Sequence, residues 1–427
     1  MTLIDKARRG QAAPAVKQVA KKEGVDVKWL IGEIAAGRVS IPANKNRKGL
    51  DPEGVGAGLR TKVNANIGTS RDRCDIRFEK KKLDAAIEAG ADAVMDLSTG
   101  GDLRAIRRAI LDACPKPLGT VPIYELLVSN RSKCADKIHI DIEELFDIIE
   151  RQAEEGVDFM TIHAGLTFKA VELLRQKPRV CGVVSRGGSF LAAYMAIHNC
   201  ENPLYENFDR LLKICRKHDV TISLGDGLRS GALADAHDRP MMHEMIVLGE
   251  LSRACREAGV QAIIEGPGHM PLDQIEANVK MEKALCEGAP YYVLGPLVTD
   301  VAPGYDHITS AIGGAIAAAA GVDFLCYVTP SEHLGLPEPE DVRRGVMASR
   351  IAAHAADIVK NPRLAEWDRK MSVARKALDW DGQKALALDP RAFDRFQPLQ
   401  DKKHKKGDKT CSMCGEYCAY QLTDNVI

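Results

Sequence analysis

Short apolar runs alternate with longer amphipathic stretches from about residue 60 to residue 340, and this alternation constrains the fold most strongly. The amphipathic stretches 78–90, 142–156 and 242–259 place apolar residues three or four positions apart and end at glycine, which is typical of helices. A repeat of strand and helix predicts βα units around a parallel sheet. Eight such units would close into a (β/α)8 TIM-type barrel, whereas an open doubly wound sheet is the alternative with the same periodicity. Nine runs are candidate strands: 62–68, 93–98, 118–124, 159–165, 181–188, 221–227, 261–269, 291–297 and 324–330.

The two ends of the chain differ from this repeat. Residues 1–60 hold two short helical patterns and then a segment rich in Pro, Gly and Asn, so we predict a small N-terminal domain. The catalytic barrel domain would span 61–340, and the pattern of 341–400 predicts C-terminal helices without intervening strands. Residues 401–427 begin with a lysine-rich charge run, which predicts a flexible tail that carries a cysteine cluster.

Charge and apolar content limit the partners of this protein. Among the 427 residues, 59 are basic and 59 are acidic, so a net charge of zero argues against a nucleic acid or a membrane surface as partner. Residues 1–20 carry charges throughout and lack the apolar core of a secretory signal, which predicts a cytoplasmic location. The stretch of small and apolar side chains at 311–321 is too short to span a membrane. Twelve cysteines in a cytoplasmic protein indicate reduced thiols or metal ligands.

Polar side chains follow nearly all the candidate strands. A barrel builds its active site at the carboxyl ends of its strands, so we expect these side chains to meet at one mouth. Ser185, Arg186 and Gly187 offer a hydroxyl, a guanidinium and an unhindered backbone N–H, which suits a phosphate group. Arg229 is a second cation near this mouth or, alternatively, part of a surface ion pair. The residues at the strand ends are Asn66, Met95, Asp96, Tyr124, His163, Ser185, Asp226, Glu265, Glu332 and His333.

His269 and His333 are candidate ligands of a divalent metal. His269 ends one candidate strand and His333 follows another, so both would lie at the same mouth of the barrel. Imidazole nitrogen is a common ligand of zinc and of iron, but two histidines alone do not complete a site. The spacing therefore leaves open whether a metal binds there.

A cluster of three cysteines lies close to the C-terminus. Cys411, Cys414 and Cys418 have the spacing C-x2-C-x3-C. Zinc would take these thiolates together with a fourth ligand such as His404, whereas a [4Fe–4S] cluster would take three and leave one iron open for S-adenosylmethionine. A flexible tail would let such a cluster reach the mouth of its own barrel or of a neighbouring one.

Eleven motifs follow one another along the chain: "NANIG", "VMDLSTGG", "GTVPIY", "TIHAG", "VSRGGS", "SLGDGLR", "EGPGH", "LGPLVTDVAPGYDHITSAIGGA", "LCYVTPSEHLGLP", "IAAHAAD" and "CSMCGEYC". With these motifs the chain resembles the ThiC family from about Ile41 to Cys418. The resemblance implies a radical S-adenosylmethionine carbon–carbon lyase. Members of the family convert 5-aminoimidazole ribotide into 4-amino-5-hydroxymethyl-2-methylpyrimidine phosphate in thiamine biosynthesis. They use a [4Fe–4S] cluster, S-adenosylmethionine and a second divalent metal, zinc or iron.

The resemblance also implies partners and residue roles. It implies a homodimer in which the cluster tail of one subunit reaches the barrel of the other, and a reductase, flavodoxin or ferredoxin as electron donor. The implied catalytic residues are His163, Asp226 and Glu265, the metal ligands are His269 and His333, and the cluster ligands are Cys411, Cys414 and Cys418. The implied substrate contacts are Asn66, Met95, Tyr124, His163, Ser185, Arg186, Gly187, Asp226, Gly227, Leu228, Arg229, Glu265 and Tyr292.

Two positions depart from the family pattern. Three residues separate the last two cysteines where many members have four, and Ser230 stands where the pattern usually has proline, beside Arg229. A close paralogue, 5-hydroxybenzimidazole synthase, resembles this family throughout and converts the same ribotide into the lower-ligand base of a cobamide. The sequence motifs leave this second product as the alternative.

Overall fold

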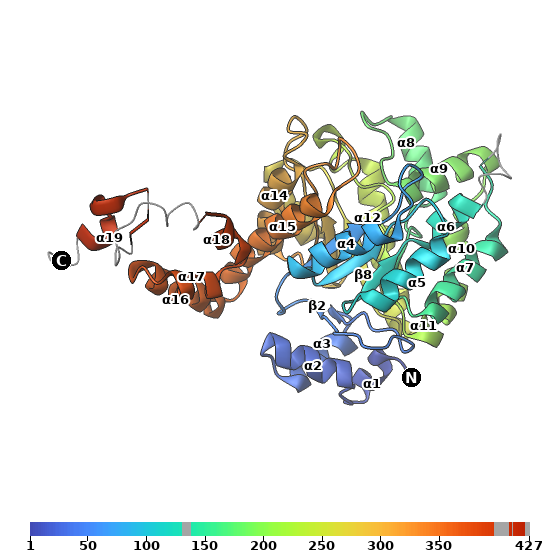
Figure 1. Ribbon diagram of the computed structural model, residues 1–427. Helices are drawn as coiled ribbons and strands as arrows, with labels where there is room; N and C mark the ends of the chain where they lie inside the picture. The colour runs from blue at the N-terminus through green and yellow to red at the C-terminus, as the bar shows by residue number, and fades with distance from the viewer. Residues whose placement is uncertain (130–137, 397–409, 412, 423–427) are drawn as a thin grey trace. The chain divides into compact units, whose positions relative to one another are not determined.

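The structure is a computed structural model that describes residues 1–129, 138–396, 410–411 and 413–422 (Figure 1). It divides into two compact units, Met1–Ala356 and Asp357–Ile427, and each is described by itself. His404, the candidate fourth ligand of a zinc ion, and most of the predicted tail lie outside the described residues. The limits of the four predicted segments, 1–60, 61–340, 341–400 and 401–427, stay a prediction.

Eight parallel strands form a closed barrel in the first unit (Figure 1). The order around the barrel is β10, β3, β4, β5, β6, β7, β8, β9, so strands that follow one another in the sequence are neighbours. This confirms the TIM-type barrel and excludes the open doubly wound sheet. The strands are β3 (Lys62–Ile67), β4 (Ala93–Asp96), β5 (Leu118–Thr120), β6 (Phe159–Ile162), β7 (Thr221–Leu224), β8 (Ala262–Gly266), β9 (Tyr291–Leu294) and β10 (Phe324–Cys326).

Helices connect the strands and pack against them. The predicted helices at 78–90, 142–156 and 242–259 correspond to α4, α7 and α12, and the small-residue stretch 311–321 lies largely in α14. Their apolar faces join the strand side chains in one hydrophobic core. The connecting helices are α4 (Ile76–Glu88), α5 (Leu103–Ala113), α6 (Pro122–Ser129), α7 (Ile142–Glu155), α8 (Phe168–Gln176), α9 (Arg186–His198), α10 (Pro203–Glu206), α11 (Phe208–His218), α12 (Arg239–Glu257), α13 (Ile275–Leu285) and α14 (Asp306–Ala320).

The prediction of a strand at 181–188 is wrong. Ser185 accepts a hydrogen bond from the backbone N–H of Gly188 at 3.2 Å and caps the N-terminus of α9. Val183 packs against the barrel core, but Val184 is 41% exposed, so the run is not buried as a barrel strand would be. The segment is therefore a loop that leads into a helix, and the barrel keeps eight strands.

The first sixty residues cover the amino ends of the barrel strands. Three helices, α1 (Leu3–Arg8), α2 (Pro14–Glu23) and α3 (Val27–Ala35), precede a short antiparallel pair, β1 (Val39–Ser40) and β2 (Val55–Gly56). Most of their apolar side chains form a hydrophobic cluster separate from the barrel core, whereas Val55 of β2 belongs to the barrel core. The Ser40 hydroxyl donates to the carbonyl of Ala262, the first residue of β8, at 2.8 Å. This part of the chain therefore lies at the end of the barrel opposite the carboxyl ends of the strands.

Helices follow the last barrel strand, as predicted. The helix that begins at Ala365 ends at Lys376, because Leu378 adopts a left-handed φ of 51° and Asp379 caps the next helix. Among the described helices, none combines the length and apolar composition needed to cross a bilayer. These helices are α15 (Pro339–Lys360), which contains the boundary between the two units, α16 (Ala365–Lys376), α17 (Trp380–Leu386), α18 (Arg391–Phe396) and α19 (Ala419–Leu422).

Candidate active site

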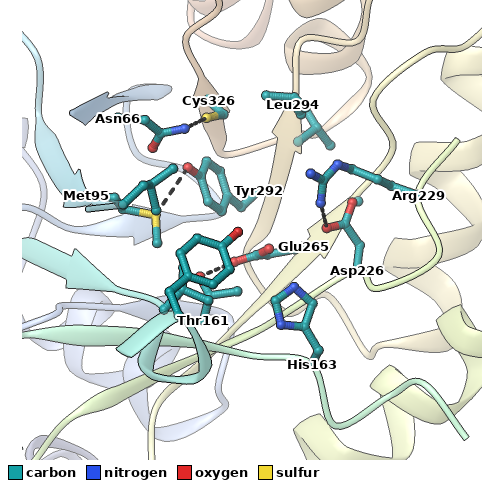
Figure 2. Close-up of a pocket in the computed structure, with 15 residues that line it drawn as sticks. Asn66, Met95, Thr161, His163, Asp226, Arg229, Glu265, Tyr292, Leu294 and Cys326 are labelled. Carbon is teal, nitrogen blue, oxygen red and sulfur yellow. Dashed lines mark hydrogen bonds and ion pairs between the residues drawn. The ribbon is translucent and has the colours of Figure 1, made fainter. Parts of the chain in front are cut away.

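A pocket opens at the carboxyl ends of the barrel strands (Figure 2). Each of the eight strands, or the segment directly after it, supplies at least one lining residue. The pairing of parallel strands accounts for this convergence, since Asn66 pairs with Met95 and Glu265 pairs with Tyr292 across neighbouring strands. The lining residues are Asn66, Met95, Leu97, Val121, Tyr124, Thr161, His163, Asp226, Arg229, Glu265, Gly266, Tyr292, Val293, Leu294 and Cys326.

The structure brings most of the predicted site residues to this pocket. Eight of the predicted substrate contacts line it directly: Asn66, Met95, Tyr124, His163, Asp226, Arg229, Glu265 and Tyr292. The other five lie in two loops beside it. Ser185, Arg186 and Gly187 begin α9, whereas Gly227 and Leu228 lie between Asp226 and Arg229.

Glu265 is a buried carboxyl held by two hydroxyl groups. Its Oε1 accepts from the Thr161 hydroxyl at 2.7 Å (Figure 2). The same oxygen accepts from the Ser223 hydroxyl at 2.6 Å. Burial raises the pKa of Glu265, and the two hydrogen bonds oppose that rise. Thr161 and Ser223 are absent from the sequence prediction because each lies inside an apolar strand run.

Asp226 and Arg229 form an ion pair on the loop after β7. An Arg229 guanidinium nitrogen lies 3.2 Å from Asp226 Oδ1, whereas Asp226 Oδ2 is buried without a hydrogen-bond partner among the described residues (Figure 2). Burial raises the pKa of Asp226 well above its usual range, although Arg229 attracts the charged form. Asp226 is therefore a carboxyl that can hold a proton inside the pocket.

Two buried residues hold this loop from behind. Glu244 Oε2 accepts from the backbone N–H of Leu228 at 2.8 Å, and burial raises the pKa of Glu244 to about 8. Arg179 donates to the Leu228 carbonyl at 2.7 Å and pairs with Asp238 at 2.6 Å. Neither Glu244 nor Arg179 was predicted from the sequence, because no spacing links them to the loop that they hold.

His163 is a buried histidine at the edge of the pocket. Its Nε2 lies 3.1 Å from the Ser185 hydroxyl, and its Nδ1 has no hydrogen-bond partner among the described residues. Burial, with a smaller contribution from the Arg229 charge, lowers the pKa of His163 to about 3. A side chain at Gly187 would place its Cβ 2.4 Å from His163 Cε1, so only glycine lets α9 approach the ring this closely.

The start of α9 offers groups that suit an anion. Ser185 caps this helix, and the backbone N–H groups of its first turn point away from the helix. Arg186 is exposed and lies over the Tyr124 ring, with its guanidinium carbon 5.0 Å from the ring centroid. Helix N-termini attract negative charge, and a guanidinium beside one adds a second attraction.

A chain of amide, hydroxyl and thiol groups lines the opposite wall of the pocket. Asn64 donates to the Tyr292 hydroxyl at 2.7 Å and to the Asn66 side-chain oxygen at 2.8 Å. Asn66 in turn donates to Cys326 Sγ at 3.1 Å (Figure 2). Burial raises the pKa of Cys326 to about 12, so this side chain is a neutral thiol. Asn64 and Cys326 were not predicted, although both lie in candidate strands.

The two histidines predicted as metal ligands lie side by side. The ring centroids of His269 and His333 are 5.3 Å apart. His269 Nδ1 lies 2.7 Å from Asp300 and His333 Nδ1 lies 2.8 Å from Asp306. Two imidazoles that are each held by Nδ1 present their Nε2 atoms for a metal, which is the usual arrangement around a bound ion.

Ser230 connects the loop after β7 to this histidine pair. Its hydroxyl donates to the backbone carbonyl of His269, and the backbone N–H of His269 donates to the Ser230 carbonyl at 2.9 Å. Proline would lack the first of these bonds. The residue that departs from the family pattern is therefore buried and bonded within the site.

A different group on the outside of the barrel also has metal-ligand geometry. Ligand atoms of Glu150, Glu154 and His218 lie within 4.8 Å of one another, on α7 and α11. Lys217 lies 2.5 Å from Glu150 and 3.7 Å from Glu154, so the two carboxylates already have a cationic partner. We assign this group to an ion pair rather than to the pocket.

The three predicted cluster ligands lie on a tight turn in the second unit. The backbone N–H of Gly415 donates to the Cys411 carbonyl at 3.0 Å, and that of Tyr417 donates to the Cys414 carbonyl at 3.0 Å. Backbone N–H groups of Cys414 and Met413 lower the pKa of Cys411, which favours its thiolate. Three neighbouring thiols with N–H groups around a sulfur fit the donor set of an iron–sulfur cluster.

The fold and the pocket define a barrel enzyme with its polar groups at the carboxyl ends of the strands and a separate three-thiol segment. The model of the Radical SAM ThiC family matches residues 2–425. The chain belongs to this family, and it is therefore an enzyme that uses an iron–sulfur cluster and S-adenosylmethionine.

Curated relatives extend over nearly the whole chain. Phosphomethylpyrimidine synthase of Desulforamulus reducens is 57% identical over 423 residues, which cover 99% of this chain and 97% of the relative. The protein of the same name from Moorella thermoacetica is also 57% identical over 423 residues, with the same coverage. Among solved structures, a Coxiella burnetii dihydropteroate synthase in complex with pteroic acid has a TM-score of 0.41 and 11% identity, covering 71% of this chain and 94% of that one. That likeness is too weak to bear on function.

Proposed function

We propose that the chain is a phosphomethylpyrimidine synthase that converts 5-aminoimidazole ribotide into 4-amino-5-hydroxymethyl-2-methylpyrimidine phosphate for thiamine. The observation that carries the proposal is the convergence of His163, Asp226, Arg229 and Glu265 on one pocket. The name shared by relatives at 57% identity supports this product over 5-hydroxybenzimidazole.

The phosphate of the ribotide would bind at the start of α9. Ser185 offers a hydroxyl, Gly187 offers a backbone N–H without a side chain, and the exposed Arg186 offers a guanidinium. Arg229 adds a cation from the loop after β7, although it already forms an ion pair with Asp226. These four residues would supply mainly affinity, since they contact a group that does not react.

The ribose and imidazole would lie against the carboxyl groups deeper in the pocket. His163, Asp226 and Glu265 are the proposed catalytic residues. The lowered pKa of His163 keeps its ring neutral, whereas burial raises the pKa of Asp226 and of Glu265 and so favours the protonated form of either carboxyl. The remaining proposed substrate contacts are Asn66, Met95, Tyr124, Gly227, Leu228 and Tyr292.

Cys411, Cys414 and Cys418 would hold a [4Fe–4S] cluster in the second unit. When bound, a reduced cluster would supply the electron that cleaves a carbon–sulfur bond of S-adenosylmethionine and starts the radical reaction. Three protein thiolates would leave one iron for the cosubstrate. The predicted homodimer, the reductase, flavodoxin or ferredoxin donor, and the cytoplasmic location stay predictions.

His269 and His333 would hold a second divalent metal, zinc or iron. Their adjacent rings and their carboxylate partners fit such an ion, because neutral imidazoles bind metals through the nitrogen that the carboxylate does not contact. The protein would supply two ligands and leave the other positions to cosubstrate or water.

The proposal is tested by anaerobic reconstitution of the full chain with iron and sulfide. We expect Cys414→Ala to lose cluster absorption and the formation of 5′-deoxyadenosine from S-adenosylmethionine. Cys74→Ala is the matched control, since Cys74 is an exposed thiol whose Sγ contacts the backbone carbonyl of Ser70. Full turnover in the Cys414→Ala variant would refute the role of the three thiols.

A further inference from the structure

The carboxylates of Asp300 and Asp306 hold His269 and His333 from one short segment of the chain. Asp300 lies in the loop between β9 and α14, and Asp306 is the first residue of α14. His269 follows β8 and His333 follows β10. These two strands are the neighbours of β9, the strand that precedes the loop with Asp300. One segment of seven residues therefore sets the orientation of both rings.

Each carboxylate is itself fixed by a backbone group. The second oxygen of Asp300 accepts from the N–H of Leu233 at 3.0 Å. The second oxygen of Asp306 accepts from the N–H of Gly304 at 3.1 Å, and the N-terminus of α14 favours its negative charge. A carboxylate that is held in this way is a rigid acceptor for the ring that it faces.

The contact with a carboxylate determines where the imidazole proton lies. An ionised carboxylate only accepts hydrogen bonds, so a neutral His269 or His333 carries its proton on Nδ1 and exposes the lone pair of Nε2. Within the part of the chain that the structure describes, neither Nε2 makes a hydrogen bond.

We propose that Asp300 and Asp306 are positioning residues that fix the Nδ1–H tautomer of both histidines and hold the two Nε2 atoms ready for one divalent metal. The inference rests on the second metal of the proposed function. It assigns to the segment 300–306 a role that neither the spacing of its residues nor the pocket lining indicates.

The first test needs no metal. The full chain is labelled with nitrogen-15 at histidine, and side-chain nitrogen shifts report which ring nitrogen carries the proton. We expect His269 and His333 in the Nδ1–H form, and a shift toward mixed tautomers of His269 in Asp300→Asn and of His333 in Asp306→Asn. Asp273→Asn is the matched control, since Asp273 is an exposed carboxylate four residues from His269.

The second test measures the affinity for cobalt after chelator treatment of the full chain. The component of cobalt binding that is lost in His269→Ala is assigned to the histidine site. This variant therefore distinguishes cobalt bound by the histidines from cobalt bound by the thiols. For this component we expect the dissociation constant to rise about 10–100-fold in Asp300→Asn and in Asp306→Asn, and to stay unchanged in Asp273→Asn. Asp300 is half-exposed, so its variant folds even if the buried Asp306 proves essential to α14.

The outcomes separate the inference from the proposed function. If His269→Ala leaves cobalt binding unchanged, the second metal is wrong and the inference falls with it. If His269→Ala removes the component while both aspartate variants keep native affinity and native tautomers, the metal site stands and only the positioning role is overturned.

Discussion

Glu244 Oε2 lies 2.8 Å from the backbone nitrogen of Leu228 and accepts its hydrogen, behind the loop that carries Asp226 and Arg229. The other carboxyl oxygen of Glu244 is buried without a hydrogen-bond partner among the described residues. A carboxyl in such surroundings is costly to ionise. Burial therefore favours the protonated form of Glu244, although the N–H of Leu228 opposes this effect.

This relationship predicts a change in how stability depends on pH. The folded pKa of Glu244 is about 8 against an ordinary 4.5, so between these values the folded chain keeps a proton that the unfolded chain has lost. The free energy of unfolding therefore falls as pH rises across this range. Glu244→Gln cannot ionise and still offers an oxygen to Leu228. Between roughly pH 6 and pH 8, we expect the free energy of unfolding of Glu244→Gln to fall by about 2 kcal/mol less than that of the native chain.

Denaturant unfolding at several pH values measures this difference. Glu250→Gln is the control, because Glu250 lies on the same helix and is exposed. Parallel pH profiles for the native chain and Glu244→Gln would show that Glu244 is not protonated at neutral pH.

A methyl group at position 187 should displace His163. The Cβ would lie 2.4 Å from His163 Cε1, so the ring or the start of α9 must move. We expect Gly187→Ala to fold but to lose about 100-fold in turnover, since small displacements of a catalytic group are enough for that loss. Gly32→Ala is the control, because a Cβ there has no neighbour within 4 Å. Equal turnover in both variants would argue against a role for His163.

The proposed division between affinity and chemistry predicts two different kinetic signatures. Arg186→Ala removes an exposed cation at the phosphate end of the pocket, so we expect KM to rise about 10–100-fold with little change in kcat. Glu265→Gln keeps the shape of a buried group that Thr161 and Ser223 hold, so we expect mainly kcat to fall. Steady-state kinetics of both variants under anaerobic conditions measure the split, and a common signature would contradict it.

The sequence alone predicts the barrel and most of the pocket. Apolar runs with polar residues at their ends locate Asn66, His163, Asp226 and Glu265. The apolar run marks the strand, and in a barrel the carboxyl ends of all strands meet at the active site. The same pattern misassigns 181–188, since Ser185 caps a helix and Val184 faces solvent.

The sequence does not predict the residues that fix the site residues by hydrogen bonds. Glu244 lies in a helix and acts on a loop sixteen residues earlier, whereas Asp300 contacts a histidine thirty-one residues away. Neither contact has a spacing that a helix or strand would impose. Such residues become visible only when the folded chain places their side chains beside the groups that they bind.

The most direct test of the central claim is the mass of the product formed from 5-aminoimidazole ribotide. The full chain, reconstituted anaerobically, is incubated with the ribotide, S-adenosylmethionine and a reductant. We predict the mass of 4-amino-5-hydroxymethyl-2-methylpyrimidine phosphate, together with 5′-deoxyadenosine. The mass of 5-hydroxybenzimidazole in its place would contradict the proposed function.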